Sequence, residues 1–280
     1  MDRKYITLFD RFTHGGMSRR EFLDRLSLLA GSAAAANVLL PLLENNYAEA
    51  QMVPETDARL RTSMQELGAP GYLALPAAEG KYPAVIVIHE NRGLNPHIQD
   101  VARRMALEGF VAFAPDYLHT LGGTPPDPDK AREMFGNLKP EDALATSKAV
   151  RAALATHAEV NGKVGAMGFC WGGGQVNALA VADPDLAAGV AYYGSQPKSG
   201  VETIKAPLLL HYAGMDERIN AGIAGFEEAL KASGKTYELR LYEGAEHAFN
   251  NDTNAARYNK QAADLAWGRT VEFLKKNTGA

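Results

Sequence analysis

Continuous apolar runs alternate with helically spaced apolar positions along most of the chain. Residues 82–89 contain the run Ala-Val-Ile-Val-Ile, which is typical of a strand buried on both faces of a parallel sheet. Residues 97–108 follow with apolar positions at helical spacing, and Gly109 is well placed to end that helix. Residues 110–115 predict the next buried strand. Such alternation predicts a mainly parallel central sheet with helices on both faces.

The same alternation continues to the end of the chain, with no internal repeat and no sign of a second folded domain. Residues 51–70 are polar and predict a loosely ordered lead-in, and residues 119–129, rich in Gly, Pro and Asp, predict a surface loop. The length of the 119–139 segment makes a lid over a pocket plausible. The remaining expected elements are an edge strand at 71–76, strands at 163–169, 187–193, 207–213 and 237–242, and helices at 140–157, 172–182, 221–233 and 255–275.

The N-terminal residues have a different pattern. Residues 18–23 read Ser-Arg-Arg-Glu-Phe-Leu, which resembles the twin-arginine export motif of bacteria. An apolar run follows at 26–43, and residues 48–50 then give the A-x-A pattern of a cleavage site, so the expected mature chain starts at Gln51. The expected location is therefore periplasmic or exported, by way of the twin-arginine export machinery.

We accordingly divide the chain into a signal peptide at 1–50 and an α/β domain at 51–280. An amphipathic N-terminal helix or an uncleaved membrane anchor are the alternatives, and the protein is cytoplasmic if the signal is not used. The apolar run of about 18 residues is marginal for a membrane span, and it is interrupted by Gly31, Asn37 and Pro41. No stable span is expected after cleavage.

Composition narrows the function classes. The hydrophobic share of 46% and charged share of 22% are ordinary for a soluble globular protein, and the net charge of −4 leaves no basic footprint for nucleic acid. Cys170 is the only cysteine, so no intramolecular disulfide is possible and no cysteine-based zinc site can be built. Nothing in the chain suggests a metal or an organic cofactor. A lone cysteine is either a small buried apolar residue or a reactive thiol.

The context of Cys170 favours the reactive thiol. Residues 168–172 read Gly-Phe-Cys-Trp-Gly between a predicted strand and a predicted helix, which is the nucleophile-elbow pattern G-x-S-x-G with cysteine in place of serine. The helix that follows points its amide dipole at the sulfur and favours the thiolate. The backbone N–H of Trp171 is then placed to bind an oxyanion. The alternative is a buried cysteine beside a glycine-rich turn.

Such elbows belong to triads in the chain order nucleophile, acid, histidine. Asp216 follows the apolar strand at 207–213, with Glu217 as the competing acid and a plain helix N-cap as the alternative role for Asp216. His247 is the only histidine after Asp216, and it lies on a predicted loop, where a solvated histidine is the alternative. The expected roles are His247 as general base and Asp216 as the group that orients it.

Residues 70–275 resemble the dienelactone hydrolase (carboxymethylenebutenolidase) family, whose fold is the α/β-hydrolase fold. The resemblance rests on the elbow, Asp216, His247-Ala248-Phe249 and the segment His89-Glu90-Asn91-Arg92-Gly93. It implies that Glu90 contacts the resting thiol and takes its proton when substrate binds. It also implies that the backbone N–H groups of Asn91 and Trp171 form the oxyanion hole. An ion pair between Glu90 and Arg92 is the structural alternative.

One departure from the family pattern concerns the substrate. The family binds a substrate carboxylate with arginines, one of them shortly after the catalytic histidine, whereas here no arginine follows until Arg257. Arg92 or Arg132 could supply the charge. Tyr117, Tyr192 and Tyr193 lie near predicted strand ends, where they either line the pocket or pack in the core; we include Arg92, Tyr117 and Tyr193 as candidate substrate contacts.

The expected function is hydrolysis of a small ester or lactone through Cys170, Asp216 and His247, with a thioester intermediate. A broad-specificity carboxylesterase or thioesterase is the alternative within enzymes, because one scaffold hosts many chemistries. A non-catalytic periplasmic binding protein and a redox role for the lone thiol are the alternatives outside hydrolysis.

Overall fold

An eight-stranded sheet with the strand order β1-β2-β4-β3-β5-β6-β7-β8 runs through the computed structural model, which describes residues 1–47 and 51–279. The six strands from β4 to β8 in this order are parallel, and β1 and β2 join antiparallel at one edge. The predicted α/β-hydrolase fold with a mainly parallel sheet is therefore confirmed. The strands are β1 (Leu60–Glu66), β2 (Pro70–Pro76), β3 (Tyr82–Ile88), β4 (Val111–Pro115), β5 (Val160–Phe169), β6 (Ala188–Tyr192), β7 (Leu208–Ala213) and β8 (Tyr237–Tyr242).

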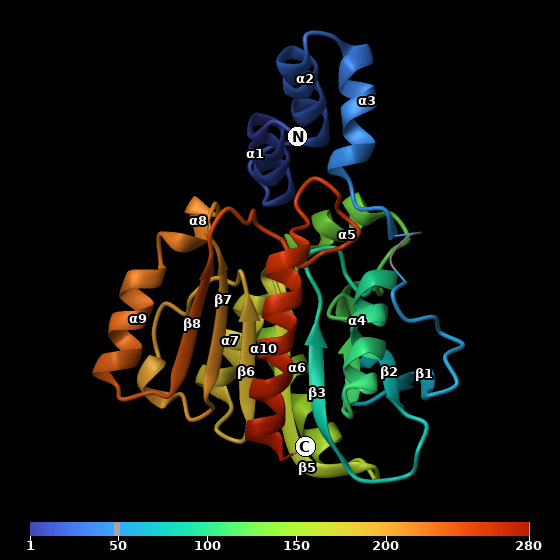
Figure 1. Cartoon of the computed structure of the whole chain (residues 1–280), viewed down its shortest axis with the longest axis vertical. Helices are drawn as coiled ribbons and strands as arrows, with labels where there is room; N and C mark the ends of the chain where they lie inside the picture. The colour runs from blue at the N-terminus through green and yellow to red at the C-terminus, as the bar shows by residue number, and fades with distance from the viewer. Residues whose placement is uncertain (48–50, 280) are drawn as a thin grey trace.

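Helices cover both faces of the sheet and create two apolar cores (Figure 1). One core holds side chains of α4 (Pro96–Leu107) and α10 (Lys260–Thr278). The other holds side chains of α6 (Pro140–Ala155), α7 (Trp171–Ala182) and α9 (Ile223–Ala232). Strands β3 to β7 contribute to both cores because their alternate side chains point to opposite faces. Short elements complete the domain: η2 (His119–Leu121), α5 (Pro128–Phe135), η3 (Val201–Thr203) and α8 (Glu217–Asn220).

Several expected boundaries differ from the structure. The lead-in at 51–70 contains the edge strand β1, so the strand expected at the edge, β2, lies second in the sheet. The sequence gives no signal for strand β1, because six of its seven side chains are not buried and so show no apolar pattern. The helix expected at 221–233 is preceded by a separate turn, α8, and the loop expected at 119–129 includes η2 and the first residues of α5.

Residues 1–47, which we call the N-terminal cap, form three helices: α1 (Arg3–Thr13), α2 (Arg19–Ala30) and α3 (Ala33–Leu43). They pack on one another around Phe9, Phe12, Phe22 and Leu26. Ser18 and Ser32 begin α2 and α3 by accepting a backbone N–H with their side chains. Figure 1 shows the cap standing above the end of the sheet where the parallel strands finish.

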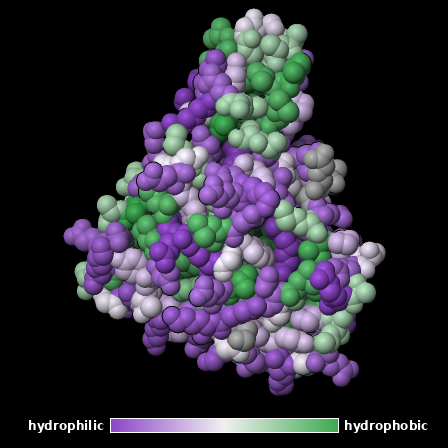
Figure 2. Space-filling view, viewed as in Figure 1, coloured by the Kyte–Doolittle hydropathy of each residue, from purple (hydrophilic) through white to green (hydrophobic). Residues whose placement is uncertain are grey.

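The outer part of the cap exposes apolar side chains. Figure 2 shows hydrophobic residues gathered on this projecting part, and Leu28 and Val38 are 83% and 71% exposed. Among the described residues no single helix is long and apolar enough to cross a membrane; α2 and α3 together have the length and composition but are bent by 113° at their break. The expected cleavage pattern at 48–50 lies outside the described residues.

Two glycines allow the tight turn between β5 and α7. A Cβ atom on Gly168 would collide with the carbonyl oxygen of Gly172, and a Cβ atom on Gly172 would lie 2.6 Å from the carbonyl oxygen of His89. The turn between them holds Cys170 at φ 55°, ψ −112°, a region that non-glycine residues rarely adopt. Both glycines are therefore required by the close approach of backbone segments.

Replacing Gly172 with Ala should lower the free energy of unfolding by about 1–3 kcal/mol, because the rigid backbone of β3 cannot move away from the added methyl group. Thermal denaturation should show a fall in melting temperature of roughly 2–6 °C, at about 2 °C per kcal/mol for a domain of this size. Gly268→Ala is the matched control: Gly268 is an exposed position in α10 with open space around it. This control should be neutral or stabilising, and equal melting temperatures for the two variants would contradict the close-approach argument.

Candidate active site

Cys170 lies at the junction of β5 and α7, at the carboxyl edge of the parallel strands. Its backbone N–H donates to the carbonyl oxygen of Tyr192 (3.0 Å), which fixes the turn to the neighbouring strand. The thiol is partly exposed and faces a cavity of about 550 Å³ that lies between the N-terminal cap and the α/β domain. The sequence-predicted nucleophile is thus at the place where open α/β sheets bind ligands.

The structure brings His247 and Asp216 together beside Cys170. Asp216 follows β7 and accepts a hydrogen bond from the backbone N–H of Ile219 (3.2 Å). It is therefore also the N-cap of α8, the alternative role expected for it. Its other oxygen, Oδ2, is hydrogen-bonded to His247 Nδ1. His247 lies on the loop after β8 and is 4% exposed. Its Nε2 has no hydrogen-bond partner and lies within 4.8 Å of the sulfur of Cys170.

Backbone strain is concentrated around these side chains. Among the described residues, the non-glycine residues with positive φ are Cys170, Tyr193 and Ala248, at 55°, 39° and 66°. Tyr193 packs its ring against His247 with 4.9 Å between centroids, and Ala248 follows His247 directly. Such conformations cost about 1–3 kcal/mol each and persist where the surrounding structure enforces them. The fold thus holds Cys170 and His247 in fixed positions.

Electrostatics at this position favour a thiolate–imidazolium pair. Burial opposes ionisation of the thiol, but the facing rings of His247 and His14 outweigh it and lower the pKa of Cys170 to about 6. Burial likewise opposes the charged form of His247, but the sulfur of Cys170 and the carboxylate of Asp216 raise its pKa to about 10. The bond to His247 also outweighs burial at Asp216 and lowers the pKa of that carboxyl.

Glu90 and Asn91 end β3 and line the same cavity. Glu90 is buried; its Oε2 accepts from the side-chain amide of Asn251 (2.9 Å), and its Oε1 has no hydrogen-bond partner. Arg92 turns away from Glu90 and donates to Asp129 (2.6 Å), so the expected alternative of a Glu90–Arg92 ion pair is wrong. A buried carboxylate with one free oxygen beside a thiol is costly unless it has a function.

The remaining candidates differ in their access to the cavity. Arg92 lines it. Tyr117 does not: its hydroxyl bonds to Ser147 (2.8 Å) and its ring packs against Trp171, so it is a core residue and not a substrate contact. Tyr193 is buried behind His247 and also does not line the cavity. The indole of Trp171 packs among His89, Tyr117 and Phe135, which leaves only its backbone for oxyanion binding.

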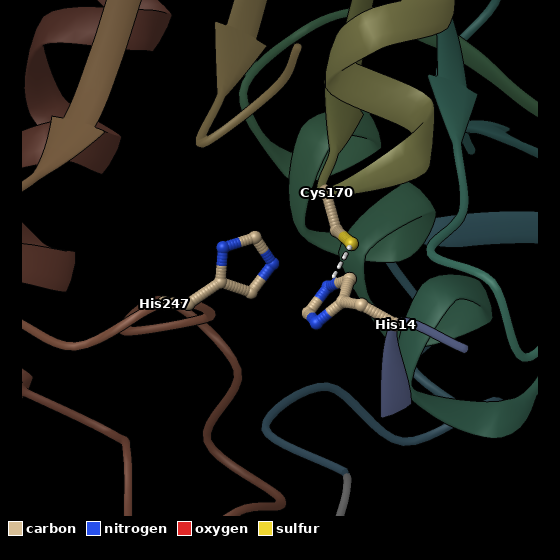
Figure 3. A group of neighbouring side chains, drawn as sticks. All are labelled: His14, Cys170 and His247. Atoms are coloured by element: carbon tan, nitrogen blue, oxygen red, sulfur yellow. Dashed lines mark hydrogen bonds between the residues drawn. The ribbon is translucent and has the colours of Figure 1, made fainter. Parts of the chain in front are cut away.

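The N-terminal cap reaches directly into this site, which the sequence patterns did not predict. Figure 3 shows His14 and His247 on either side of Cys170, and His14 Nε2 lies 3.4 Å from the sulfur. The carbonyl oxygen of Thr13 accepts the side-chain amide of Asn91 (2.7 Å). The two imidazole rings meet edge to face, with 4.6 Å between centroids. Because His14 is 156 residues from Cys170 in sequence, no local motif could have paired them.

The model of the dienelactone hydrolase family matches residues 69–278. The chain belongs to the dienelactone hydrolase family. A protein of Klebsiella pneumoniae whose crystal structure is described as a dienelactone hydrolase superposes with a TM-score of 0.70 at 29% identity, covering 78% of this chain and 99% of that one.

Two relatives named as carboxymethylenebutenolidases differ in how far they extend. The protein of Saccharolobus solfataricus is 34% identical over 242 residues, which cover 73% of this chain and 93% of the relative. The protein of Methylorubrum extorquens is 33% identical over 294 residues, which cover 97% of this chain and 99% of the relative. The second alignment therefore extends into the N-terminal cap, whereas the family model begins after it.

In this member of the dienelactone hydrolase family, the arginines that line the cavity differ in part from the expected ones: Arg92 lines it, Arg132 does not, and Arg257 does. Arg257, which the sequence pattern placed too far from His247, lines the cavity and is 7% exposed. It lies 3.8 Å from Asp10 of the cap and stacks over the ring of Phe9. Arg132 does not line the cavity and packs over the ring of Phe12. The cavity therefore carries Arg92 and Arg257 as its arginines from the α/β domain.

The pH dependence of thiol alkylation tests the ion pair. In buffer containing EDTA, the rate of Cys170 alkylation by iodoacetamide should rise with pH and reach half its maximum near pH 6, because only the thiolate reacts and its pKa lies at about 6 instead of the usual 9.0. In His247→Ala the half-maximum should move upward, since a facing imidazolium is lost. A wild-type half-maximum near pH 9 would contradict the pairing.

Proposed function

We propose that this dienelactone hydrolase family member cleaves a small ester or lactone, with Cys170 as nucleophile, His247 as general base and acid, and Asp216 as the group that orients His247. The observation that carries the proposal is the bond between His247 Nδ1 and Asp216, which directs the free Nε2 toward the sulfur. Family membership makes the chain a carboxylic ester hydrolase, and the cavity of about 550 Å³ has the size of a small-molecule site.

The first half of the reaction forms a thioester. The thiolate of Cys170 attacks the carbonyl carbon, and the carbonyl oxygen becomes an oxyanion that accepts the backbone N–H groups of Trp171 and Asn91. The intermediate then expels the alkoxide, which takes the proton from His247 Nε2. The acyl group is now bonded to sulfur, and the alcohol, or in a lactone the opened hydroxyl end, is free.

Water completes the cycle. Neutral His247 accepts a proton from a water molecule that attacks the thioester carbonyl, and the collapse of the second oxyanion breaks the carbon–sulfur bond. The products are a carboxylic acid, which releases its proton to solvent and becomes a carboxylate, and the regenerated thiolate facing a protonated His247. Whenever Cys170 carries a proton on its sulfur, we assign to Glu90 the role of temporary acceptor for that proton, because its Oε1 is buried at the cavity without a hydrogen-bond partner.

The charges of the cavity favour a substrate that carries a carboxylate. Arg92 and Arg257 both line the cavity from the α/β domain. The partner of Arg257 is Asp10, a residue of the N-terminal cap. A substrate carboxylate can take the place of Asp10 if the cap leaves, which restores the charge pairing of a buried guanidinium.

Turnover should depend on the thiol. The chain without residues 1–50 should hydrolyse dienelactone, and Cys170→Ala should reduce kcat/KM by at least about a thousandfold because it removes the covalent route. The two proteins should be assayed with p-nitrophenyl acetate in parallel, with circular dichroism melts to show that both are folded. Turnover of the simple ester alone would favour a broad carboxylesterase. Equal rates in the two proteins would reject Cys170, and no turnover in either would favour a binding protein.

We further propose that residues 1–50 are a twin-arginine signal that takes the folded protein to the periplasm. The twin arginines begin α2, and exposed apolar side chains of α2 and α3 follow them. An export receptor needs access to such a segment, and Arg20 is exposed on the surface. Removal of this segment would also take the cap away from the cavity.

Substituting both Arg19 and Arg20 with Lys should keep the protein in the cytoplasm of a bacterium with the twin-arginine route, because the signal is read as an arginine pair and not as charge alone. Cell fractionation and the apparent mass of the product measure the effect. Arg25→Lys, on the same helix, is the matched control and should be exported and shortened. Equal export of the two variants would reject the twin-arginine assignment.

A further inference from the structure

We propose that His14, Cys170 and His247 bind a divalent transition metal of the zinc class, which fastens the N-terminal cap over the active site. The three ligand atoms, two imidazole nitrogens and a sulfur, all lie within 4.8 Å of one another. Figure 3 shows the two rings approaching the sulfur from different elements, with His14 arriving from the end of α1. The site therefore exists only when the cap is docked.

The distances suit a small ion. Zinc–sulfur and zinc–nitrogen bonds of about 2.3 and 2.0–2.1 Å place tetrahedral ligands roughly 3.5 Å apart, and His14 Nε2 lies 3.4 Å from the sulfur. His247 Nε2 is buried and has no hydrogen-bond partner. This nitrogen therefore needs only a small approach to complete a three-ligand set.

The outer partners of both histidines are those that metal sites use. His247 bonds through Nδ1 to the carboxylate of Asp216. His14 bonds through Nδ1 to the backbone oxygen of Asp10 (2.8 Å), and the Asp10 carboxylate lies 3.3 Å from the same nitrogen. A partner at Nδ1 leaves Nε2 as the metal-binding atom and fixes the plane of the ring. Both imidazoles are thus oriented with Nε2 toward the sulfur.

The ligand types select the metal. A thiolate with two imidazoles favours Zn²⁺ and the metals with similar preferences over Mg²⁺ or Ca²⁺, which prefer oxygen ligands. The fourth position faces the cavity, because all three residues line it, and a water molecule can fill that position. Binding requires a thiolate and two neutral imidazoles, so the proton shared by the Cys170–His247 pair is released to solvent.

A metal at this position has two consequences. It occupies the sulfur and the base of the triad, so ester cleavage should stop while it is bound; this part rests on the proposed function. It also bridges the cap and the α/β domain, so the cap should leave more slowly; this part does not. Metal loading would thereby keep the capped chain inactive until the metal or the cap is removed.

Cobalt provides a direct readout, because a Co²⁺ thiolate gives a charge-transfer band in the near ultraviolet and tetrahedral Co²⁺ absorbs strongly in the visible. Titration of the full chain with CoCl₂ should develop both bands to one equivalent, and ZnCl₂ should bleach them. His14→Ala should weaken Co²⁺ binding by roughly 10–100-fold or more. His157→Ala, which changes a histidine outside the cavity lining, is the matched control and should bind as the wild type does.

Trypsin digestion of the full chain measures, without any substrate, whether the metal holds the N-terminal cap on the α/β domain. Zn²⁺ should slow cleavage after Arg20 at least about tenfold in the wild type and in His157→Ala, but not in His14→Ala. Absence of the cobalt bands, equal binding in His14→Ala and wild type, or equal digestion with and without Zn²⁺ would each overturn the proposal. Cobalt binding by the full chain, together with no ester turnover by the metal-free chain without residues 1–50, would reject the proposed function and leave the metal site standing.

Discussion

The strained turn at Cys170 is the constraint on which the site depends. Three backbone segments, the ends of β3, β5 and β6, approach the first turn of α7 so closely that only hydrogen atoms fit at Gly168, Gly172 and Gly173. The turn holds the sulfur at the carboxyl edge of the sheet with φ 55°. Parallel strands bring the ends of β7 and β8 to the same edge, so Asp216 and His247 need only short loops to reach the sulfur. The placement of Cys170, Asp216 and His247 at one edge is thus a property of the sheet and not of any one loop.

Charge balance at this edge has two layers. Cys170 and His247 stabilise each other as an ion pair, and Asp216 holds the second ring nitrogen of His247. The N-terminal cap then repeats this arrangement from the other side, because His14 faces the sulfur and Asp10 faces His14. Asp10 also lies beside Arg257. The cap therefore places a base against the sulfur, and a carboxylate beside both that base and Arg257.

The absence of an arginine shortly after His247 can be understood from the contacts of the loop that follows it. The loop after His247 carries no arginine before Arg257; it carries Asn251, whose side-chain amide donates to the buried Glu90. Arg257, several residues later, returns to the cavity wall because the loop before α10 folds back over the site. Its aliphatic stem and guanidinium pack against Phe9 of the cap. The loop after His247 thus supplies a cation to the cavity, but from Arg257 and not from a residue directly after the histidine.

The sequence by itself determined the parallel sheet and the order of its main elements, and it predicted Cys170, Asp216 and His247 as a group that the structure brings together. It could do so because buried strands need continuous apolar runs and because the elbow requires glycine at fixed spacing around Cys170. The sequence suggests Tyr117 as a substrate contact, but the residue lies in the core. A tyrosine near a strand end has the same local pattern whether it lines a pocket or bonds to Ser147 in the core. Only the tertiary structure decided the edge position of β1, the return of Arg257 and the docking of His14 on the sulfur. These contacts join residues far apart in the chain, and their free energy comes from surfaces that meet only after folding. The spacing of residues along the sequence therefore does not predict them.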